Sequence, residues 1–219
     1  MSAILQHLTE GTKKREEGLA MKARVTHFTR SAYKVMPWKN GAGSTTELFI
    51  SPRGASVQSG FDWRISLARV PASGPFSSFP GYHRTIMLLQ GEPMRLVHEG
   101  HGTHTLQALQ PYAFHGAWIT EGILSGGPVE DFNVMMREDL GQAHVDVHQV
   151  REDTPFPTRS APLQFIWCWS GAATVEVQTM RHSLKEQESL LIEEGADITI
   201  HPESATSVFI IVSITPHSG

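Results

Sequence analysis

The sequence predicts an all-β fold of two jelly-roll lobes with few, short helices. Short runs rich in β-branched and aromatic residues alternate with Gly, Pro and Ser, which is typical of sandwiches and barrels. No window carries the long apolar spacing of an amphipathic helix. A faint repeat relates residues 88–116 to residues 167–195, which indicates two similar lobes. Double-sheet rolls protect their strand edges, so a two-lobed roll is the expected architecture.

The strands follow from this punctuation in chain order. We expect strands at residues 24–28, 45–51, 63–70, 85–90, 94–98, 104–109, 132–137, 143–150, 163–169, 173–179, 189–193, 198–201 and 208–214. Residues 1–20 are expected to form an extension, either disordered or a frayed helix. Residues 21–150 are assigned to a first lobe that holds the ligand site. The Pro- and Thr-rich stretch 152–160 indicates a linker, so residues 151–219 comprise this linker and the second lobe.

Composition excludes several classes of function. The chain has 219 residues, 18 Lys and Arg against 22 Asp and Glu, and a net charge of -4. This charge supplies no basic field for nucleic acid, and no apolar run is long enough to span a membrane. A single cysteine, Cys168, cannot form an internal disulfide, which favours a buried thiol and a cytoplasmic protein.

A polar loop between residues 36 and 47 is the first candidate for a binding site. Lys39 and Asn40 follow Trp38 just before a predicted strand that begins at Thr45, and the three residues offer a cation, an amide and a hydroxyl. The glycines there lack the third glycine of a dinucleotide fingerprint and precede a strand, so a phosphate loop is a weak interpretation. A simple turn is the other open interpretation.

Period-two alternation places further polar residues together on two strands. Arg64 and Ser66 share one face of the strand at 63–70, and Asp131 and Asn133 share one face of a strand around 132–137. Asp131 is a candidate counter-ion for Arg64 or Arg84. A purely structural ion pair and a solvated outer face both remain open.

Histidines raise the question of a metal. His98, His101 and His104 come closest to a cluster, but the chain contains no His-x-His pair of the kind that metal-binding jelly rolls carry. We expect exposed hairpin histidines, no bound metal, no cofactor and no catalytic residue. If the protein were an enzyme without metal, Asp131 or His83 could serve as a base.

Four ordered blocks resemble the HutD/Ves family of cupin-like proteins. They are MPWKNGAGST (36–45), FDWRIS (61–66), GPFSSFPGY (74–82) with Arg84, and GPVEDFNVM (127–135). A further segment, Phe114-His115-Gly116-Ala117, departs from the family's pattern. The resemblance implies a bicupin fold without established catalytic activity, a role linked to histidine utilisation, and formylated or formimino derivatives of glutamate as ligands.

These observations predict a non-catalytic protein that binds a small anionic metabolite. A cupin enzyme acting on a similar anion, with or without a metal, is a second interpretation, and an interaction module without ligand, such as a homodimer surface, is a third. The predicted ligand-binding residues are Lys39, Asn40, Thr45, Arg64, Ser66, Arg84, Asp131 and Asn133.

Overall fold

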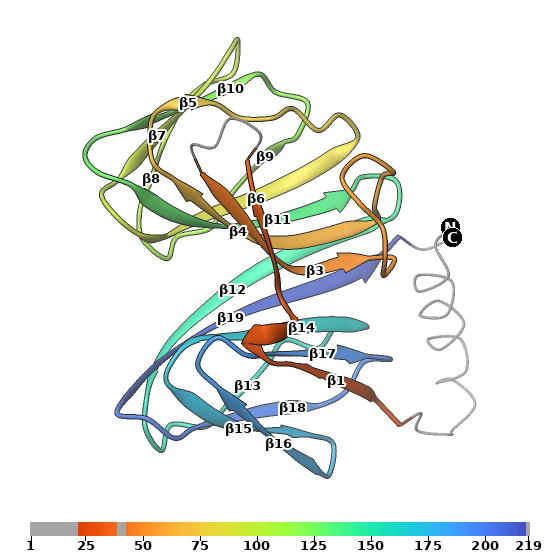
Figure 1. The fold of residues 1–219 in the computed structure, drawn as a ribbon. Coiled ribbons are helices and arrows are strands. Elements are labelled where there is room, and N and C mark those ends of the chain that lie inside the picture. The colour runs from red at the N-terminus through yellow and green to blue at the C-terminus, as the bar shows by residue number, and fades with distance from the viewer. Residues whose placement is uncertain (1–21, 39–42, 218–219) are drawn as a thin grey trace. The chain divides into compact units, whose positions relative to one another are not determined.

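A computed structural model describes residues 22–38 and 43–217 of the chain (Figure 1). The described residues fall into two compact units. One comprises Tyr33–Leu140 and is called the 33–140 unit. The other comprises residues 141–217 together with residues 22–32, and is called the 141–217 unit. Among the described residues, the one helical segment is the 3-10 turn Arg30–Ala32, as the expectation of few, short helices required.

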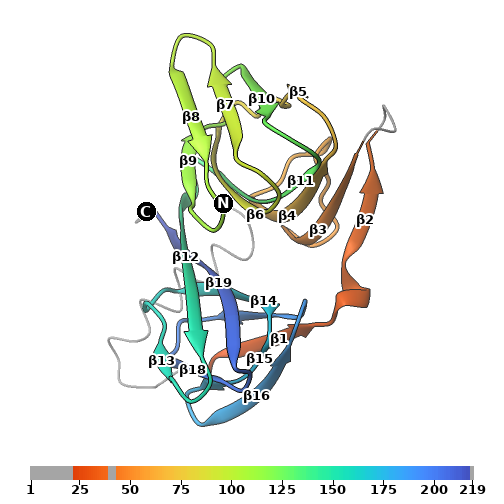
Figure 2. The same ribbon diagram turned by 90° about the vertical axis from the view of Figure 1, so that its left-hand side faces the viewer.

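The 33–140 unit is built from two antiparallel sheets that lie face to face (Figure 1). The six-stranded sheet has the order β2 (Lys34–Pro37), β3 (Ser44–Ser51), β4 (Trp63–Val70), β11 (Val129–Arg137), β6 (Tyr82–Gln90) and β9 (Tyr112–His115). The four-stranded sheet has the order β5 (Gly74–Pro75), β10 (Thr120–Leu124), β7 (Met94–His98) and β8 (Gly102–Leu106). Figure 2 shows the hairpin of β7 and β8 from the side.

Apolar residues from both sheets form the core of this unit. Ile86 and Leu88 of β6 pack in one cluster with Met94 and Leu96 of β7 and with Leu106 of β8. These side chains are at most 1% exposed. The face of the six-stranded sheet that carries Ile86 and Leu88 is therefore the inner face of the roll, and residues paired with them in register share that face.

The 141–217 unit repeats the two-sheet plan. Its five-stranded sheet has the order β1 (Arg24–Phe28), β17 (Ser189–Glu193), β14 (Leu163–Ser170), β19 (Thr206–Pro216) and β12 (Gly141–Arg151). Its four-stranded sheet has the order β13 (Phe156–Pro157), β18 (Ile198–Pro202), β15 (Ala172–Val177) and β16 (Met180–Lys185). The centre is apolar, with Ile166, Val175, Leu190, Ile200 and Phe209 fully buried.

The predicted fold class is confirmed, because both units are antiparallel two-sheet rolls. Several strands match their predicted bounds, among them Trp63–Val70 and Met94–His98. Two strands that the expected division placed in the first lobe pair elsewhere: β1 adds to β17, and β12 runs the length of β19. The sequence predicted a linker at 152–160, whereas in the structure part of this segment is the short strand β13, paired with β18.

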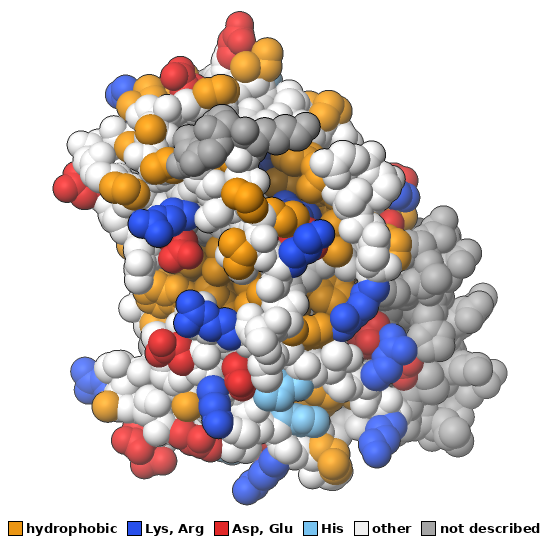
Figure 3. Space-filling model, in the orientation of Figure 1, with side chains coloured by type: hydrophobic (Ala, Val, Ile, Leu, Met, Phe, Trp, Pro, Cys, Tyr) orange, Lys and Arg blue, Asp and Glu red, His pale blue; other side chains and the backbone are white. Residues whose placement is uncertain are grey.

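Charged side chains of both signs are interspersed over the face shown in Figure 3, without a broad basic area on the described part of that face. Over the described ranges, none of the helical structure is long and apolar enough to cross a membrane. The single cysteine, Cys168, is fully buried in the 141–217 unit, and burial raises the pKa of its thiol to about 12. It is therefore a structural thiol and not a reactive one.

Candidate functional site

The polar residues predicted from alternation gather on the inner face of the 33–140 unit. Strand pairing sets Ser66 of β4 opposite Asn133 of β11, and it sets both Arg64 and Arg84 opposite Met135. Because directly opposed residues on antiparallel strands point to the same side of a sheet, these side chains share one face with Ile86 and Leu88. All the polar members are nearly buried, at 3–5% exposure for Arg64, Ser66, Arg84 and Asn133.

Arg64 has a partner that sequence reasoning missed. Its Nε atom donates to Oε2 of Glu47 on β3 at 2.8 Å, and the two side chains are 6% and 15% exposed. Glu47 lies opposite Ser66 in the sheet, so it reaches Arg64 diagonally across the strand pair. Asp131 was the candidate counter-ion for Arg64 or Arg84. Arg64 pairs with Glu47 instead, and Asp131 interacts electrostatically with Arg84. A signal was present, since Glu47 follows Thr45 at period two on a predicted strand.

Arg84 lies at the centre of the site. Its two terminal nitrogens donate to the carbonyl oxygen of Ser77 at 3.1 Å and to Oδ1 of Asn133 at 3.0 Å. Its guanidinium carbon lies 5.0 Å from the ring centroid of Phe114 and 5.6 Å from those of Phe76 and Phe79. Burial lowers the pKa of Arg84 to about 10, against the attraction of Asp131, so the guanidinium stays charged at neutral pH.

Asp131 completes a chain of contacts with Arg84. The side-chain nitrogen of Asn133 donates to Oδ1 of Asp131, and the side-chain oxygen of Asn133 accepts from Arg84. Asp131 is fully buried, and this burial raises the pKa of its carboxyl to about 7, although Arg84 acts in the opposite direction. The carboxyl group is therefore poised to gain or lose a proton near neutral pH.

Within the contacts that link Arg84, Asn133 and Asp131, two polar atoms have no hydrogen-bond partner among the described residues. They are Nε of Arg84 and Oδ2 of Asp131, and both are buried. Most buried polar groups in folded proteins have a partner, so such atoms call for an explanation by water, ion or ligand.

The loop predicted as one wall of the site is described only in part. The indole Nε1 of Trp38 donates to Oγ1 of Thr45 at 2.9 Å, and the Trp38 backbone nitrogen donates to the Gly43 carbonyl at 2.9 Å. Thr45 lies opposite Ala68, which in turn lies opposite Asp131, so Thr45 belongs to the same face. Lys39 and Asn40 lie outside the described residues.

The three histidines singled out in the sequence are packed as aromatic rings. His98 was expected to be exposed, but it is 2% exposed and contacts Thr120 Oγ1 through Nδ1 at 2.8 Å. The ring of His104 stacks on Tyr112 at 3.7 Å between centroids, and that of His101 stacks on Trp118 at 4.2 Å. Burial lowers the pKa of His98, which keeps its ring neutral at neutral pH.

Comparisons with known proteins agree with this picture. The model of the HutD family matches residues 30–210. An uncharacterized 21.2 kDa protein in the hutC 3′ region of Pseudomonas putida is 42% identical over 103 residues. That match covers 47% of this chain, and the chain spans about half (53%) of that relative.

Solved structures show the same architecture. A conserved protein of unknown function from Pseudomonas aeruginosa has a TM-score of 0.80 and 28% identity, over 88% of this chain and 99% of its own. HutD from Pseudomonas fluorescens, in a formate condition, has a TM-score of 0.68 and 29% identity, over 89% of this chain and 100% of its own. Salicylate 1,2-dioxygenase from Pseudoaminobacter salicylatoxidans, at 8% identity and a TM-score of 0.61 over 92% and 85% of the two chains, shares the fold alone.

The family model spans most of the chain, and the fold of these neighbours is the two-lobed, cupin-like roll that the sequence predicts. This chain belongs to the HutD family.

Proposed function

We propose that this protein binds a small anionic metabolite on the inner face of the 33–140 unit and releases it unchanged. The ligand class is a formylated or formimino derivative of glutamate, and the setting is histidine utilisation in the cytoplasm. The observation that carries the proposal is the buried Arg84, which keeps an unpartnered Nε among the described residues, while Asp131, linked to it through Asn133, keeps an unpartnered oxygen.

The charges on this face favour an anion. Arg64 is balanced by Glu47, whereas Arg84 faces Asp131, whose carboxyl is partly protonated at neutral pH. The positive charge of Arg84 is thus incompletely balanced. A ligand carboxylate would neutralise it and form charge-assisted hydrogen bonds with the guanidinium. The apolar rings around Arg84 would strengthen such bonds by keeping water away.

The remaining polar groups suit a formyl or formimino group. Asn133 offers both a donor and an acceptor, and a protonated Asp131 is a donor while an ionised one is an acceptor. We keep four further ligand contacts in the proposal because they lie in the sequence blocks that carry the resemblance to the HutD/Ves family: Lys39, Asn40, Thr45 and Ser66. Among the described residues, the core cluster of the 141–217 unit consists of apolar side chains, so we assign the ligand to the 33–140 unit.

The setting rests on family context. The chain belongs to the HutD family, and a relative from Pseudomonas putida lies in the hutC 3′ region. These observations support histidine utilisation as the pathway whose metabolites should be tested first.

Thermal unfolding of the full chain with formylglutamate, formiminoglutamate or urocanate tests the proposal. At least one of them should raise the melting temperature, because a ligand at about 100 times its Kd stabilises a protein by about 2.7 kcal/mol. Arg84→Met should abolish this shift. Arg69→Ala is the matched control, because Arg69 is exposed and lies on the same strand as Arg64. Absence of a shift with all three compounds contradicts the ligand assignment.

A second candidate function is acid–base catalysis on the same ligand. The buried Asp131 favours it, because a carboxyl with a pKa of about 7 is well matched to proton transfer at neutral pH. Mass spectrometry of each compound after incubation with the protein separates the two functions. Recovery of the compound unchanged supports binding alone, whereas conversion that is lost in Asp131→Asn supports the enzyme.

A further inference from the structure

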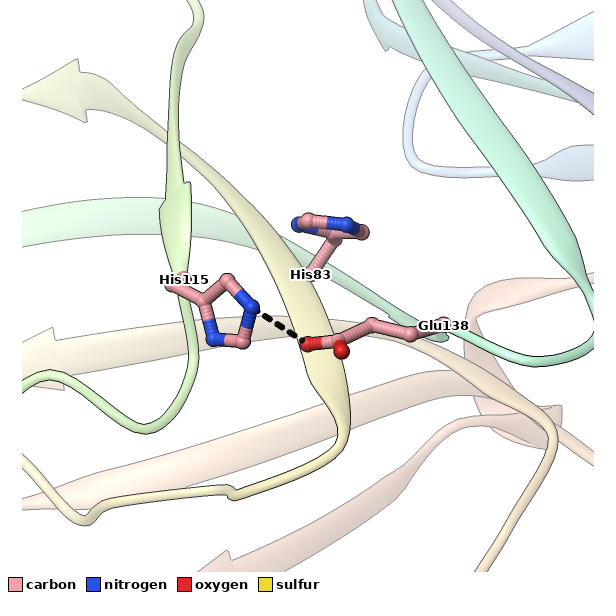
Figure 4. Close-up of side chains that lie close together, drawn as sticks. All are labelled: His83, His115 and Glu138. Atoms are coloured by element: carbon pink, nitrogen blue, oxygen red, sulfur yellow. Dashed lines mark ion pairs between the residues drawn. The ribbon is translucent and has the colours of Figure 1, made fainter.

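Three side chains with metal-binding atoms meet at one edge of the six-stranded sheet. They are His83 of β6, His115 of β9 and Glu138, which follows β11 (Figure 4). One ligand atom from each lies within 4.8 Å of the other two. Nε2 of His115 is 3.0 Å from Oε1 of Glu138, and the two imidazole centroids are 5.1 Å apart.

The backbone fixes the three positions. His83 and His115 are directly opposed in the pairing of β6 with β9, so their side chains leave the same face. The Glu138 nitrogen donates to the Gly81 carbonyl at 2.9 Å, and the Gly116 nitrogen donates to the Tyr82 carbonyl at 2.7 Å. Sites carried on paired strands hold their ligands more accurately than sites on free loops.

We propose that His83, His115 and Glu138 bind a divalent transition-metal ion, with Zn²⁺ as the ion to test first. Two imidazoles and one carboxylate form a ligand set that suits Zn²⁺ and related first-row ions, and three protein ligands leave at least one position for water. His83 is exposed and the other two are half-buried, so an ion can reach the site from solvent.

The geometry needs only side-chain adjustment to hold the ion. Metal–ligand bonds of about 2.0–2.2 Å set the ligand atoms of a tetrahedral ion about 3.3 Å apart. The pair of His115 and Glu138 already lies at 3.0 Å. Rotation of the exposed His83 ring closes the remaining distance, since the whole set spans no more than 4.8 Å.

This site is distinct from the anion site. His83 directly precedes Arg84 in β6, and consecutive residues of a strand point to opposite faces of the sheet. The inference therefore does not rest on the proposed function, and each can fail without the other. Metal found in the purified protein would not by itself indicate a cupin enzyme, because these ligands do not face the interior of the roll.

Isothermal titration of the metal-free full chain with ZnCl₂ tests the inference. We expect one saturable site, and His83→Ala and Glu138→Gln should each weaken Zn²⁺ binding at least about tenfold. Loss of a group that only orients a metal ligand already weakens metal binding by about tenfold or more, so loss of a ligand itself should cost at least as much. With CoCl₂, visible absorption bands of the bound ion should appear in the unaltered protein and be lost in both variants.

His144→Ala is the matched control. Nε2 of the exposed His144 lies 3.1 Å from Oδ1 of the half-buried Asp146, a pair that resembles His115 and Glu138 but belongs to no group of three potential metal ligands among the described residues. This variant should bind Zn²⁺ as the unaltered protein does. Unfolding temperatures measured without metal show that each variant is folded. Equal affinity in His83→Ala and the unaltered protein, or no saturable binding at all, overturns the inference.

Discussion

Asp131 is the residue whose chemistry departs furthest from its ordinary behaviour. Its pKa is about 7 in the folded protein, whereas an Asp in an unfolded chain titrates near 3.9. Between these values the folded state binds more protons than the unfolded state, so this group's contribution to stability is lost as pH rises. At higher pH the folded protein must hold a buried carboxylate.

Asp131→Asn should therefore change stability in a pH-dependent manner. Relative to the unaltered protein, the stability of the variant should be about 3 kcal/mol higher at pH 8 than at pH 5, from about two pKa units at about 1.4 kcal/mol per unit. Urea denaturation at both pH values measures it. Asp139→Asn is the control, because Asp139 is an exposed carboxyl whose pKa Arg137 lowers, and it should give no such difference.

Glu47 balances the nearly buried Arg64. Glu47→Gln should lower the free energy of unfolding by about 3 kcal/mol, because it leaves a buried guanidinium without its anion. Adding Arg64→Met should restore part of that loss. Glu176→Gln breaks the exposed pair with Arg181 and should cost less than about 1 kcal/mol. Equal losses in the two single variants would show that the Glu47 pair is no better than a surface pair.

Alternation alone was enough to place four of the eight candidate site residues. It set Arg64 with Ser66 and Asp131 with Asn133, and the pairing of Ser66 with Asn133 brings both sets to one face. It could not choose partners, because the diagonal reach from Arg64 to Glu47 depends on strand order and on the register shift after Glu47. Those are properties of the sheet and not of any one strand.

At the scale of elements, the sequence predicted most strands but missed β2, β9, β10 and β16 as well as the two shortest, β5 and β13. β5 and β13 have two residues each, and each contains a proline. Proline normally argues against a strand interior, and so short a run has no visible alternation. Neither proline content nor alternation tells which distant strand will pair with such a segment, so this pairing is known only from the folded sheets.

Gly116 ties the end of β9 to the loop that shapes the surroundings of Arg84. A Cβ atom there would lie 2.6 Å from the Tyr82 carbonyl oxygen and would also meet the Phe79 carbonyl oxygen. Gly116→Ala should therefore destabilise the protein by about 1–3 kcal/mol, as overpacking does. Gly127→Ala meets no atom within 4 Å and should be nearly neutral. Thermal unfolding of both variants measures the difference.

At the scale of the whole molecule, two rolls of one plan have different interiors. The 141–217 unit has an apolar centre, while the 33–140 unit carries Arg64, Arg84, Asp131 and Asn133 on its inner face. The faint internal repeat indicated two related lobes but not this difference, because an inward-facing polar residue and a solvated one have the same alternation. The division of polar residues between the units predicts where a ligand binds.

A crystal structure of the protein grown with formylglutamate tests the central claim most directly. The account predicts the ligand on the inner face of the 33–140 unit, with a carboxylate within hydrogen-bond distance of Arg84 and the formyl group next to Asn133 or Asp131. A ligand bound in the 141–217 unit or on the outer surface would contradict the account. A ligand at full occupancy that makes no contact with Arg84 would also contradict it.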